Sequence, residues 1–246
     1  AHLILNGADP RRILLLTFAR RMAAEMTRRV ERICATALKG RTFAVGDTIE
    51  WSGTFHAVGA KLLRLYAENI GLEPEFSILD RSDAADLMDL VRDDLELSRT
   101  GGRFPKKATC LAIYSYAVNA QIPVREALDR AFPWCREWAE PLTGLFARYV
   151  ETKQAQAVLD YDDLLLYWSQ MMQTGEIARL VSERFDHILV DEYQDTNALQ
   201  ASILVSLKPD GTGVTVVGDD AQAIYSFRSA TVRNILDFPS CFDPPA

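Results

Sequence analysis

No apolar run in this sequence is long enough to cross a lipid bilayer, which takes about 20 consecutive apolar residues. The longest runs are short stretches such as Ile13 to Leu16 and Ile188 to Val190. The N-terminus lacks the basic-then-apolar pattern of a secretory signal. The four cysteines are too scattered for zinc-binding pairs or a disulfide framework. These absences argue against a membrane-spanning or disulfide-stapled secreted protein, and they predict a cytoplasmic protein with reduced thiols.

A positive net charge is also missing. The formal net charge is −7, which argues against a protein that binds nucleic acid merely by being basic. The charges are nevertheless uneven: residues 1–70 hold 11 Lys/Arg against 6 Asp/Glu, whereas residues 151–246 hold 6 against 15. The first segment could follow a phosphate backbone and the last could hold a metal ion, although charge alone is more typical of solvated surfaces.

Four short apolar stretches predict buried strands, because each is compact, often β-branched and followed at once by a polar turn. They are Ile13 to Thr17, Ile49 to Phe55, His187 to Asp191 and Val214 to Gly218. A helical pattern follows the first of them from about Ala19 to Leu38, and Asn197 is a candidate cap for the helix after Asp195. Apolar strands alternating with helices predict an α/β fold, with a parallel sheet covered on both faces.

The strand signals disappear between about Ile78 and Leu159. Helical segments in this stretch are separated by the turn formers Gly101, Gly102, Pro105, Pro123, Pro133 and Pro141. We predict that residues 78–159 form an all-helical subdomain inserted between residues 1–77 and 160–238, the two parts of the sheet domain. Residues 239–246, with three prolines, have the composition of a linker or a cut end.

An acidic string of seven residues, Asp191 to Asn197, comes directly after the predicted strand that contains Ile188 to Val190. Ligands of parallel α/β sheets bind at the carboxyl ends of the strands. Asp191 is therefore a candidate Mg²⁺ ligand, and Glu192 could orient and deprotonate an attacking water. An isolated Asp-Glu pair would be only an acidic turn, but the full string favours a site.

A second polar string runs from Val217 to Arg228, at the end of the last predicted strand. Gln222 can hydrogen-bond a phosphate or a water, and Arg228 can stabilise charge on a transferred phosphoryl group. Tyr225 and Phe227 alternate with these groups and could stack on bases. Taken alone, the two aromatic side chains are more typical of a hydrophobic core.

These segments together resemble the UvrD/Rep/PcrA-like superfamily-one DNA helicases. The two polar strings are similar to that family's DExQDxN and GDxxQxIYxFRxA motifs. Three further segments occur in the family's order: Ile13 to Phe18 with Ala23 to Met26 resembles motif Ia, Gly53 to His56 resembles the GTFH element, and Asp160 to Leu165 resembles the D[FY]DDL element. The resemblance extends from about Ala1 to Phe238, and five motifs in fixed order make a chance match improbable.

The resemblance implies a RecA-like ATPase core (domain 1A, a P-loop NTPase fold) with the helical subdomain 1B inserted. It implies ATP and Mg²⁺ as cofactors, single-stranded DNA and DNA junctions as partners, 3′ to 5′ movement, and a bacterial-type cytoplasmic protein. In this reading Asp191 holds the metal, Glu192 is the catalytic base, and Gln222 and Arg228 sense the γ-phosphate. The implied DNA contacts are Thr17, Phe18, Thr54, His56, Tyr225 and Phe227. His56 alone would be more typical of a core or helix-start histidine.

The family's phosphate-binding loop, GxxxxGK[ST], is absent from these residues, and so is a second RecA-like domain. The chain also begins at Ala1 rather than at a methionine, which suggests a fragment. We expect it alone to bind ATP and Mg²⁺ weakly or not at all, and neither to hydrolyse ATP nor to unwind DNA. We also expect an uncovered sheet edge or apolar surface to favour self-association.

Two other functions fit parts of the same pattern. One is a non-catalytic DNA-binding or scaffold protein that kept the helicase fold without the phosphate loop. The other is a metal-dependent nuclease with a two-metal carboxylate cluster, made of Asp191, Glu192, Asp195 and Asp219. The nuclease leaves Gln222 and Arg228 without a role.

Overall fold

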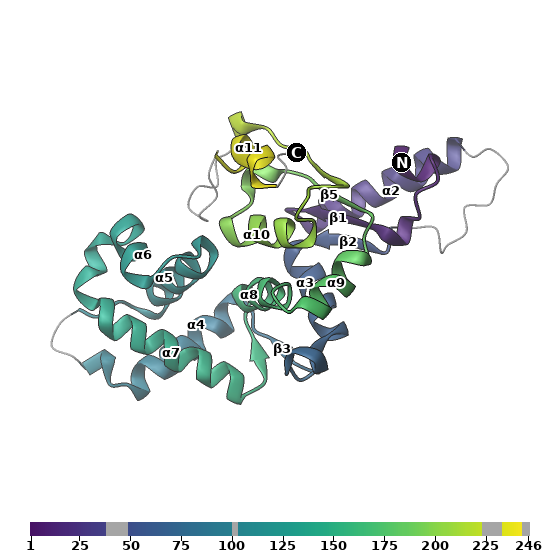
Figure 1. Cartoon of the computed structure of the whole chain (residues 1–246). Helices are drawn as coiled ribbons and strands as arrows, with labels where there is room; N and C mark the ends of the chain where they lie inside the picture. The colour runs from purple at the N-terminus through teal and green to yellow at the C-terminus, as the bar shows by residue number, and fades with distance from the viewer. Residues whose placement is uncertain (38–48, 100–102, 223–232, 243–246) are drawn as a thin grey trace. The chain divides into compact units, whose positions relative to one another are not determined.

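The computed structural model describes residues 1–37, 49–99, 103–222 and 233–242 (Figure 1). The chain divides into two compact units, one made of Ala1–Leu62 with Trp168–Ala246 and the other of Leu63–Tyr167. The second unit includes all of residues 78–159, for which an inserted helical subdomain is predicted; that subdomain assignment stays a prediction. Within the described ranges, no helix has the length and apolar character needed to span a membrane.

The first unit is built on a four-stranded sheet in the order β2-β1-β5-β6, and every neighbouring pair is parallel. This confirms the predicted parallel α/β sheet. Each predicted stretch supplies one strand. The first, β1 (Ile13–Thr17), has the predicted bounds, and the others are slightly shorter than expected: β2 (Trp51–Thr54), β5 (His187–Val190) and β6 (Val214–Val216).

Strand β1 lies inside the sheet, and its composition explains why. All five of its residues are buried. Leu14 is paired with Trp51 of β2 on one side and with Ile188 of β5 on the other. A strand that is hydrogen-bonded on both edges and covered on both faces has no solvent side, so it is apolar throughout instead of alternating with polar residues.

Helix α2 (Arg20–Ala37) covers one face of this sheet. Its residues Met26 and Val30 pack in one hydrophobic cluster with Ile13 and Leu15 of β1. The helix spans nearly the range expected from the sequence, beginning one residue later. Its expected last residue, Leu38, lies outside the described residues. Because α2 starts just after β1 ends, its first turn lies at the carboxyl edge of the sheet (Figure 1).

Helix α10 begins with the cap that the sequence predicts. The Asn197 side chain accepts a hydrogen bond from the backbone N–H of Gln200, and the Gln200 side chain accepts one in return from the Asn197 backbone. This capping box satisfies two N–H groups that a helix start leaves without a partner.

The helices of the first unit are α1 (His2–Leu5), α2, α3 (Phe55–Leu65), α8 (Tyr161–Met171), α9 (Gly175–Glu183), α10 (Ala198–Leu207) and α11 (Arg233–Asp237). Helices α3 and α8 cross the boundary between the two units.

The second unit is mainly helical and has its own hydrophobic core, which includes the fully buried Met88, Ile113 and Leu142. Two short strands, β3 (Ser77–Ile78) and β4 (Val158–Leu159), pair in parallel at the two ends of the predicted insert and were not foreseen. Two-residue strands carry too little pattern to be recognised in a sequence. The helices are α4 (Arg81–Asp94), α5 (Lys107–Ala120), α6 (Val124–Ala131) and α7 (Ala139–Ala155).

A buried ammonium group organises the segment from Asp160 to Leu165. Lys153 is 2% exposed, and its Nζ lies 2.7 Å from Asp160 Oδ2 and 2.6 Å from Asp163 Oδ2. The hydroxyl of Tyr149 donates a further hydrogen bond of 2.9 Å to Asp160. Burial and the charge of Asp160 raise the pKa of Asp163 to about 6, against the opposing effect of Lys153. Lys153 is therefore the counter-charge of two buried carboxyl groups.

We predict that Lys153→Met destabilises the protein by about 3–5 kcal/mol at pH 7.5, because it leaves two buried carboxylates without a cation. Urea unfolding measures this loss. The loss should shrink at pH 5, since the raised pKa of Asp163 lets this carboxylate take up a proton there. Lys106→Met, at an exposed position, is the matched control and should change stability by less than about 0.5 kcal/mol. Equal stability of the two variants would contradict a role for the buried lysine.

Candidate functional site

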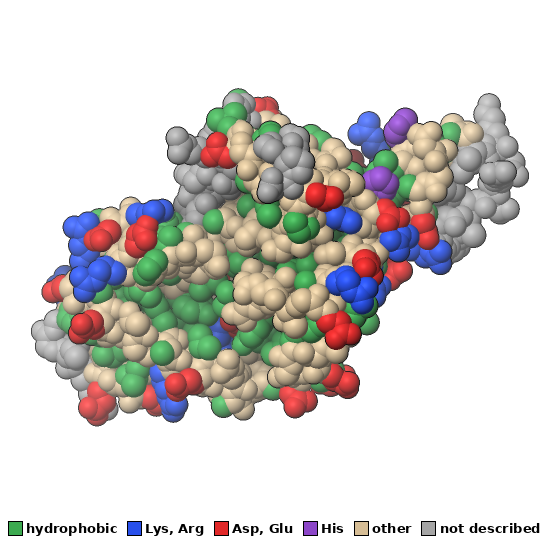
Figure 2. All heavy atoms as spheres, in the orientation of Figure 1, with side chains coloured by type: hydrophobic (Ala, Val, Ile, Leu, Met, Phe, Trp, Pro, Cys, Tyr) green, Lys and Arg blue, Asp and Glu red, His purple; other side chains and the backbone are tan. Residues whose placement is uncertain are grey.

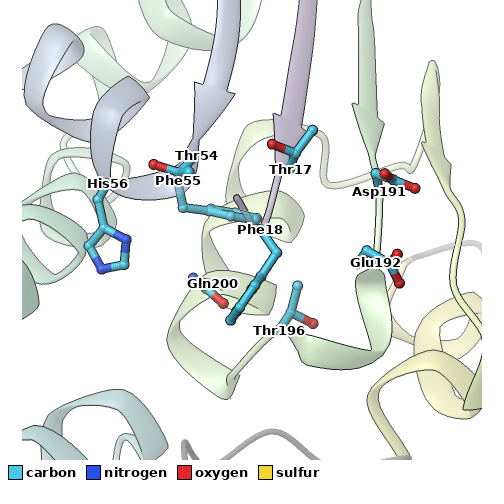
Figure 3. Close-up of a pocket in the computed structure, with 9 residues that line it drawn as sticks. All are labelled: Thr17, Phe18, Thr54, Phe55, His56, Asp191, Glu192, Thr196 and Gln200. Carbon is cyan, nitrogen blue, oxygen red and sulfur yellow. The ribbon is translucent and has the colours of Figure 1, made fainter. Parts of the chain in front are cut away.

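A cavity of about 120 Å³ opens at the carboxyl ends of three strands in the first unit (Figure 3). Strand β1 contributes its last residue and the one after it, β2 leads into the start of α3, and β5 leads into the acidic string. This is where parallel α/β sheets bind ligands. The cavity is lined by Thr17, Phe18, Thr54, Phe55, His56, Asp191, Glu192, Thr196 and Gln200, so six predicted site residues lie around one space.

Asp191 and Glu192 extend from the end of β5. The Asp191 backbone N–H donates a 2.9 Å hydrogen bond to the Leu16 carbonyl of β1, which fixes the strand end. Burial, and then the negative charge of Glu192, raise the pKa of Asp191. A bound cation would relieve both effects, and carboxylate oxygens are ligands that Mg²⁺ accepts.

The donor set fits a magnesium ion only in part. Among the described residues there is no group of three or more His, Cys, Asp or Glu side chains that could hold a metal ion. Asp191 and Glu192 can contribute one or two carboxylate oxygens, and water would complete an octahedral shell. This also counts against the two-metal nuclease, since Asp195 and Asp219 do not join the two acids in one cluster.

The backbone at Glu192 adopts an uncommon conformation. Its φ of 55° and ψ of 45° lie in the left-handed region, which a residue with a side chain enters at a cost. Gln194, in the short turn that follows, is 1% exposed, and its Nε2 donates a 2.6 Å hydrogen bond to Glu192 Oε2. The turn therefore holds the Glu192 carboxylate in a set direction at the cavity.

The same glutamine joins the end of β5 to the end of β6. The Asp219 backbone N–H donates a 3.0 Å hydrogen bond to Gln194 Oε1, and Gln222 Nε2 donates one of 2.7 Å to Asp219 Oδ2. Strands β5 and β6 pair directly. A hydrogen-bonded path thus runs from Glu192 through Gln194 and Asp219 to Gln222. The sequence-predicted partners Tyr225, Phe227 and Arg228 lie outside the described residues.

The two predicted threonine contacts have their hydroxyl groups engaged in the fold. Thr17 is 1% exposed, and its Oγ1 donates a 3.0 Å hydrogen bond to the Ala19 carbonyl. Thr54 Oγ1 accepts a 3.2 Å hydrogen bond from the Ala57 N–H at the start of α3. These hydroxyls shape turns. The partly exposed ring of Phe18 is the larger surface offered to a ligand.

The imidazole of His56 is directed away from the two carboxylates (Figure 3). It lines the cavity from the first turn of α3. This position is compatible with a role of His56 beside Phe18, and it is not compatible with a role at the two carboxylates.

Three lining residues were missed in the sequence: Phe55, Thr196 and Gln200. Thr196 Oγ1 donates a 2.7 Å hydrogen bond to the Tyr193 carbonyl, closing the acidic turn. Gln200 reaches the cavity because it is the second partner of the capping box. The Asn197-x-x-Gln200 spacing was the signal that could have identified it.

A parallel sheet with acids at its strand ends, linked to a polar segment at the next strand, is an arrangement with which α/β proteins bind ligands. The family model described as the UvrD/REP helicase N-terminal domain matches residues 1–243. The chain belongs to this family. The resemblance seen in the motifs is thereby confirmed.

Named relatives agree with this assignment. The ATP-dependent DNA helicase PcrA of Leuconostoc citreum is 36% identical over 244 residues, covering 97% of this chain and 30% of that protein. The ATP-dependent DNA helicase UvrD1 of Mycobacterium bovis is 34% identical, covering 95% of the chain and 30% of that protein. DNA helicase II of Haemophilus influenzae is 31% identical, covering 92% and 30%. The chain thus spans under a third of the length of these relatives.

We predict that Gly218→Ala lowers the free energy of unfolding by about 1–3 kcal/mol, measured by urea denaturation. A Cβ at this position would lie 2.5 Å from Gln194 Oε1 and 3.2 Å from the Gln194 backbone nitrogen. Gly144→Ala is the matched control, because a Cβ there, inside α7, meets nothing within 4 Å. That control should instead stabilise the protein by about 0.5–1 kcal/mol. A neutral Gly218→Ala would show that Gln194 does not lie against the glycine.

Proposed function

We propose that this chain is part of an ATP-dependent DNA helicase that moves 3′ to 5′ along single-stranded DNA and acts at DNA junctions. The observation that carries the proposal is the hydrogen-bonded path from Glu192 at the end of β5 to Gln222 beyond β6. An ATPase of this class needs a base and a phosphate-sensing amide near one phosphate. The names of the relatives, which are DNA helicases, support the same function.

In this proposal, four residues carry out ATP hydrolysis, each with its own role. Glu192 accepts the proton of the attacking water at its carboxylate, oriented by Gln194. Asp191 holds Mg²⁺ through water; when bound, the ion neutralises charge on the nucleotide phosphates. Gln222 donates its amide hydrogens to the terminal phosphate or to the attacking water, and Arg228 adds a positive charge there.

DNA binding is proposed for the side of the cavity that Phe18 and His56 line, away from the two carboxylates. Phe18 offers a ring on which a base can stack, and base–aromatic stacking is tolerant of sequence. Thr17 and Thr54 hold the two turns that present this ring and His56. Tyr225 and Phe227 are proposed to extend the same stacking surface. The roles of the carboxylates and of Phe18 would place nucleotide and DNA at one sheet edge.

We predict that the 246-residue chain releases no phosphate from MgATP above the buffer rate, with or without single-stranded DNA. The physical reason is that these residues contain no GxxxxGK[ST] loop to cradle the phosphates. A phosphate-release assay measures this. Turnover that disappears in Glu192→Gln would contradict the prediction, because only activity belonging to the chain itself depends on that carboxylate.

A stacking role for Phe18 predicts a loss of about 1–3 kcal/mol of binding free energy to a short oligo-deoxythymidine in Phe18→Ala. Fluorescence anisotropy of a labelled oligonucleotide measures the affinity. Trp134→Ala removes another aromatic ring, 67% exposed in the second unit, and serves as the control with unchanged affinity. An affinity that is equal in the Phe18→Ala variant and the unaltered chain would remove this ring from the DNA site.

The non-catalytic DNA-binding protein is the second candidate. Both candidates predict DNA binding without ATP turnover by this chain. They differ in the intact protein, where ATPase activity that requires Glu192 supports the helicase. Self-association of the chain alone, through a sheet edge such as that of β6, stays part of the proposal.

A further inference from the structure

Helix α2 carries five arginines, Arg20, Arg21, Arg28, Arg29 and Arg32, against two glutamates, and all five arginines are exposed. Among the residues that the structure describes, none of the five forms an ion pair. Several arginines elsewhere are paired: Arg12 lies 2.6 Å from Asp186, and Arg179 lies 3.0 Å from Glu183. The positive charge of α2 is therefore concentrated and not neutralised by described neighbours.

Three of these arginines share one side of the helix. At about 100° per residue, Arg21, Arg28 and Arg32 fall within about 40° of one another; we call them the arginine face. The buried Ala23 and Cys34 lie on the opposite side, against the sheet. The arginine face therefore points directly away from the core. Arg28 donates one hydrogen bond from Nε to the Ala24 carbonyl, which leaves its terminal N–H groups for a ligand.

The position of the charge within the helix also indicates a ligand. Arg21 lies in the first turn, where no acidic residue is present. The N-terminal end of a helix carries partial positive charge, so a cation there is unfavourable and an anion is favoured. A helix optimised only for stability would carry acids in this turn. An arginine there makes sense if an anion binds nearby.

We propose that the arginine face of α2 binds the phosphate backbone of single-stranded DNA. The inference rests on the proposed function, because it takes DNA as the partner of the same unit. The face begins near the cavity, since α2 begins two residues after Phe18 and Arg21 lies in its first turn; Arg28 and Arg32 follow further along the helix. Arg28 and Arg32 are one turn apart, about 6 Å along the helix, comparable with the spacing of successive phosphates in one strand. A strand stacked on Phe18 would then be held by this face.

The test is the affinity of the chain for a short labelled oligo-deoxythymidine, measured by anisotropy from about 50 to 200 mM salt. The combined variant Arg21→Gln, Arg28→Gln and Arg32→Gln should bind about tenfold more weakly at the lowest salt. The slope of log K against log salt should flatten by about 2, since three phosphate contacts each release about 0.7 counterion from a single strand. Unchanged affinity and slope would overturn the proposal.

A matched triple variant separates a local effect from net charge. Arg81→Gln, Arg125→Gln and Arg148→Gln remove the same charge from exposed positions of the second unit. On the face of that unit drawn in Figure 2, basic and acidic side chains are intermixed. This control should keep both the affinity and the slope. An equal loss in the control would overturn the proposal, because the effect would then come from net charge alone.

A variant that binds the oligonucleotide more tightly is a further test, because misfolding would weaken binding. Glu25 projects from the same side of α2, between Arg21 and Arg28, and its carboxylate repels phosphate. Glu25→Gln should tighten binding about twofold at low salt, and weaker or equal binding would count against the proposal. If Phe18→Ala weakens binding but the arginine variant does not, the arginine face fails while the proposed function stands. If the unaltered chain does not bind the oligonucleotide, both fail.

Discussion

The hydrogen bonds of one buried amide, that of Gln194, hold the candidate site together. Its Nε2 donates to Glu192 and its Oε1 accepts from the backbone of Asp219, so both ends of the side chain are satisfied inside the protein. A buried amide left without partners costs free energy, and the glutamine therefore fixes the ends of β5 and β6 relative to each other. The backbone of Glu192 is left-handed beside this amide, and the lack of a side chain at Gly218 leaves room for it.

The first unit carries negative and positive charge in different places. Each suits one part of the proposed function, nucleotide binding or DNA binding. Asp191 and Glu192 form a carboxylate pair whose repulsion and burial favour a cation. Helix α2, which begins at the same sheet edge, concentrates arginines on its outer side. Opposite charges on one small unit fit the proposed binding of a metal-bound nucleotide and of a polyanion. The net charge of −7 hides this arrangement because it sums over both.

Much of this architecture could be predicted from the sequence. The four strands were recognisable because a fully buried strand is apolar along its length, as in β1. The α10 cap was recognisable because Asn197 follows the acidic string and precedes an apolar helix. The adjacency of β5 and β6 followed from the family resemblance and from the rule that strand ends meet at one edge.

Other features depend on contacts between side chains that are distant in the sequence, so no local sequence pattern predicts them. Lys153 reads as an ordinary exposed lysine at the end of a helix, and only the packed structure shows its carboxylate partners. The coupling of Gln194 to Asp219 joins residues 25 positions apart. The internal hydrogen bonds of Thr17 and Thr54 likewise could not be predicted from the motifs.

A double-mutant cycle between Gln194 and Gly218 tests the central claim most directly. Urea unfolding would give the cost of Gly218→Ala in the unaltered chain and again in Gln194→Ala. If the glutamine side chain lies against the glycine and links the two strand ends, the cost falls by about 1 kcal/mol or more once the side chain is gone. Costs that agree within about 0.5 kcal/mol in both backgrounds would contradict the account, because the two residues would then be energetically independent.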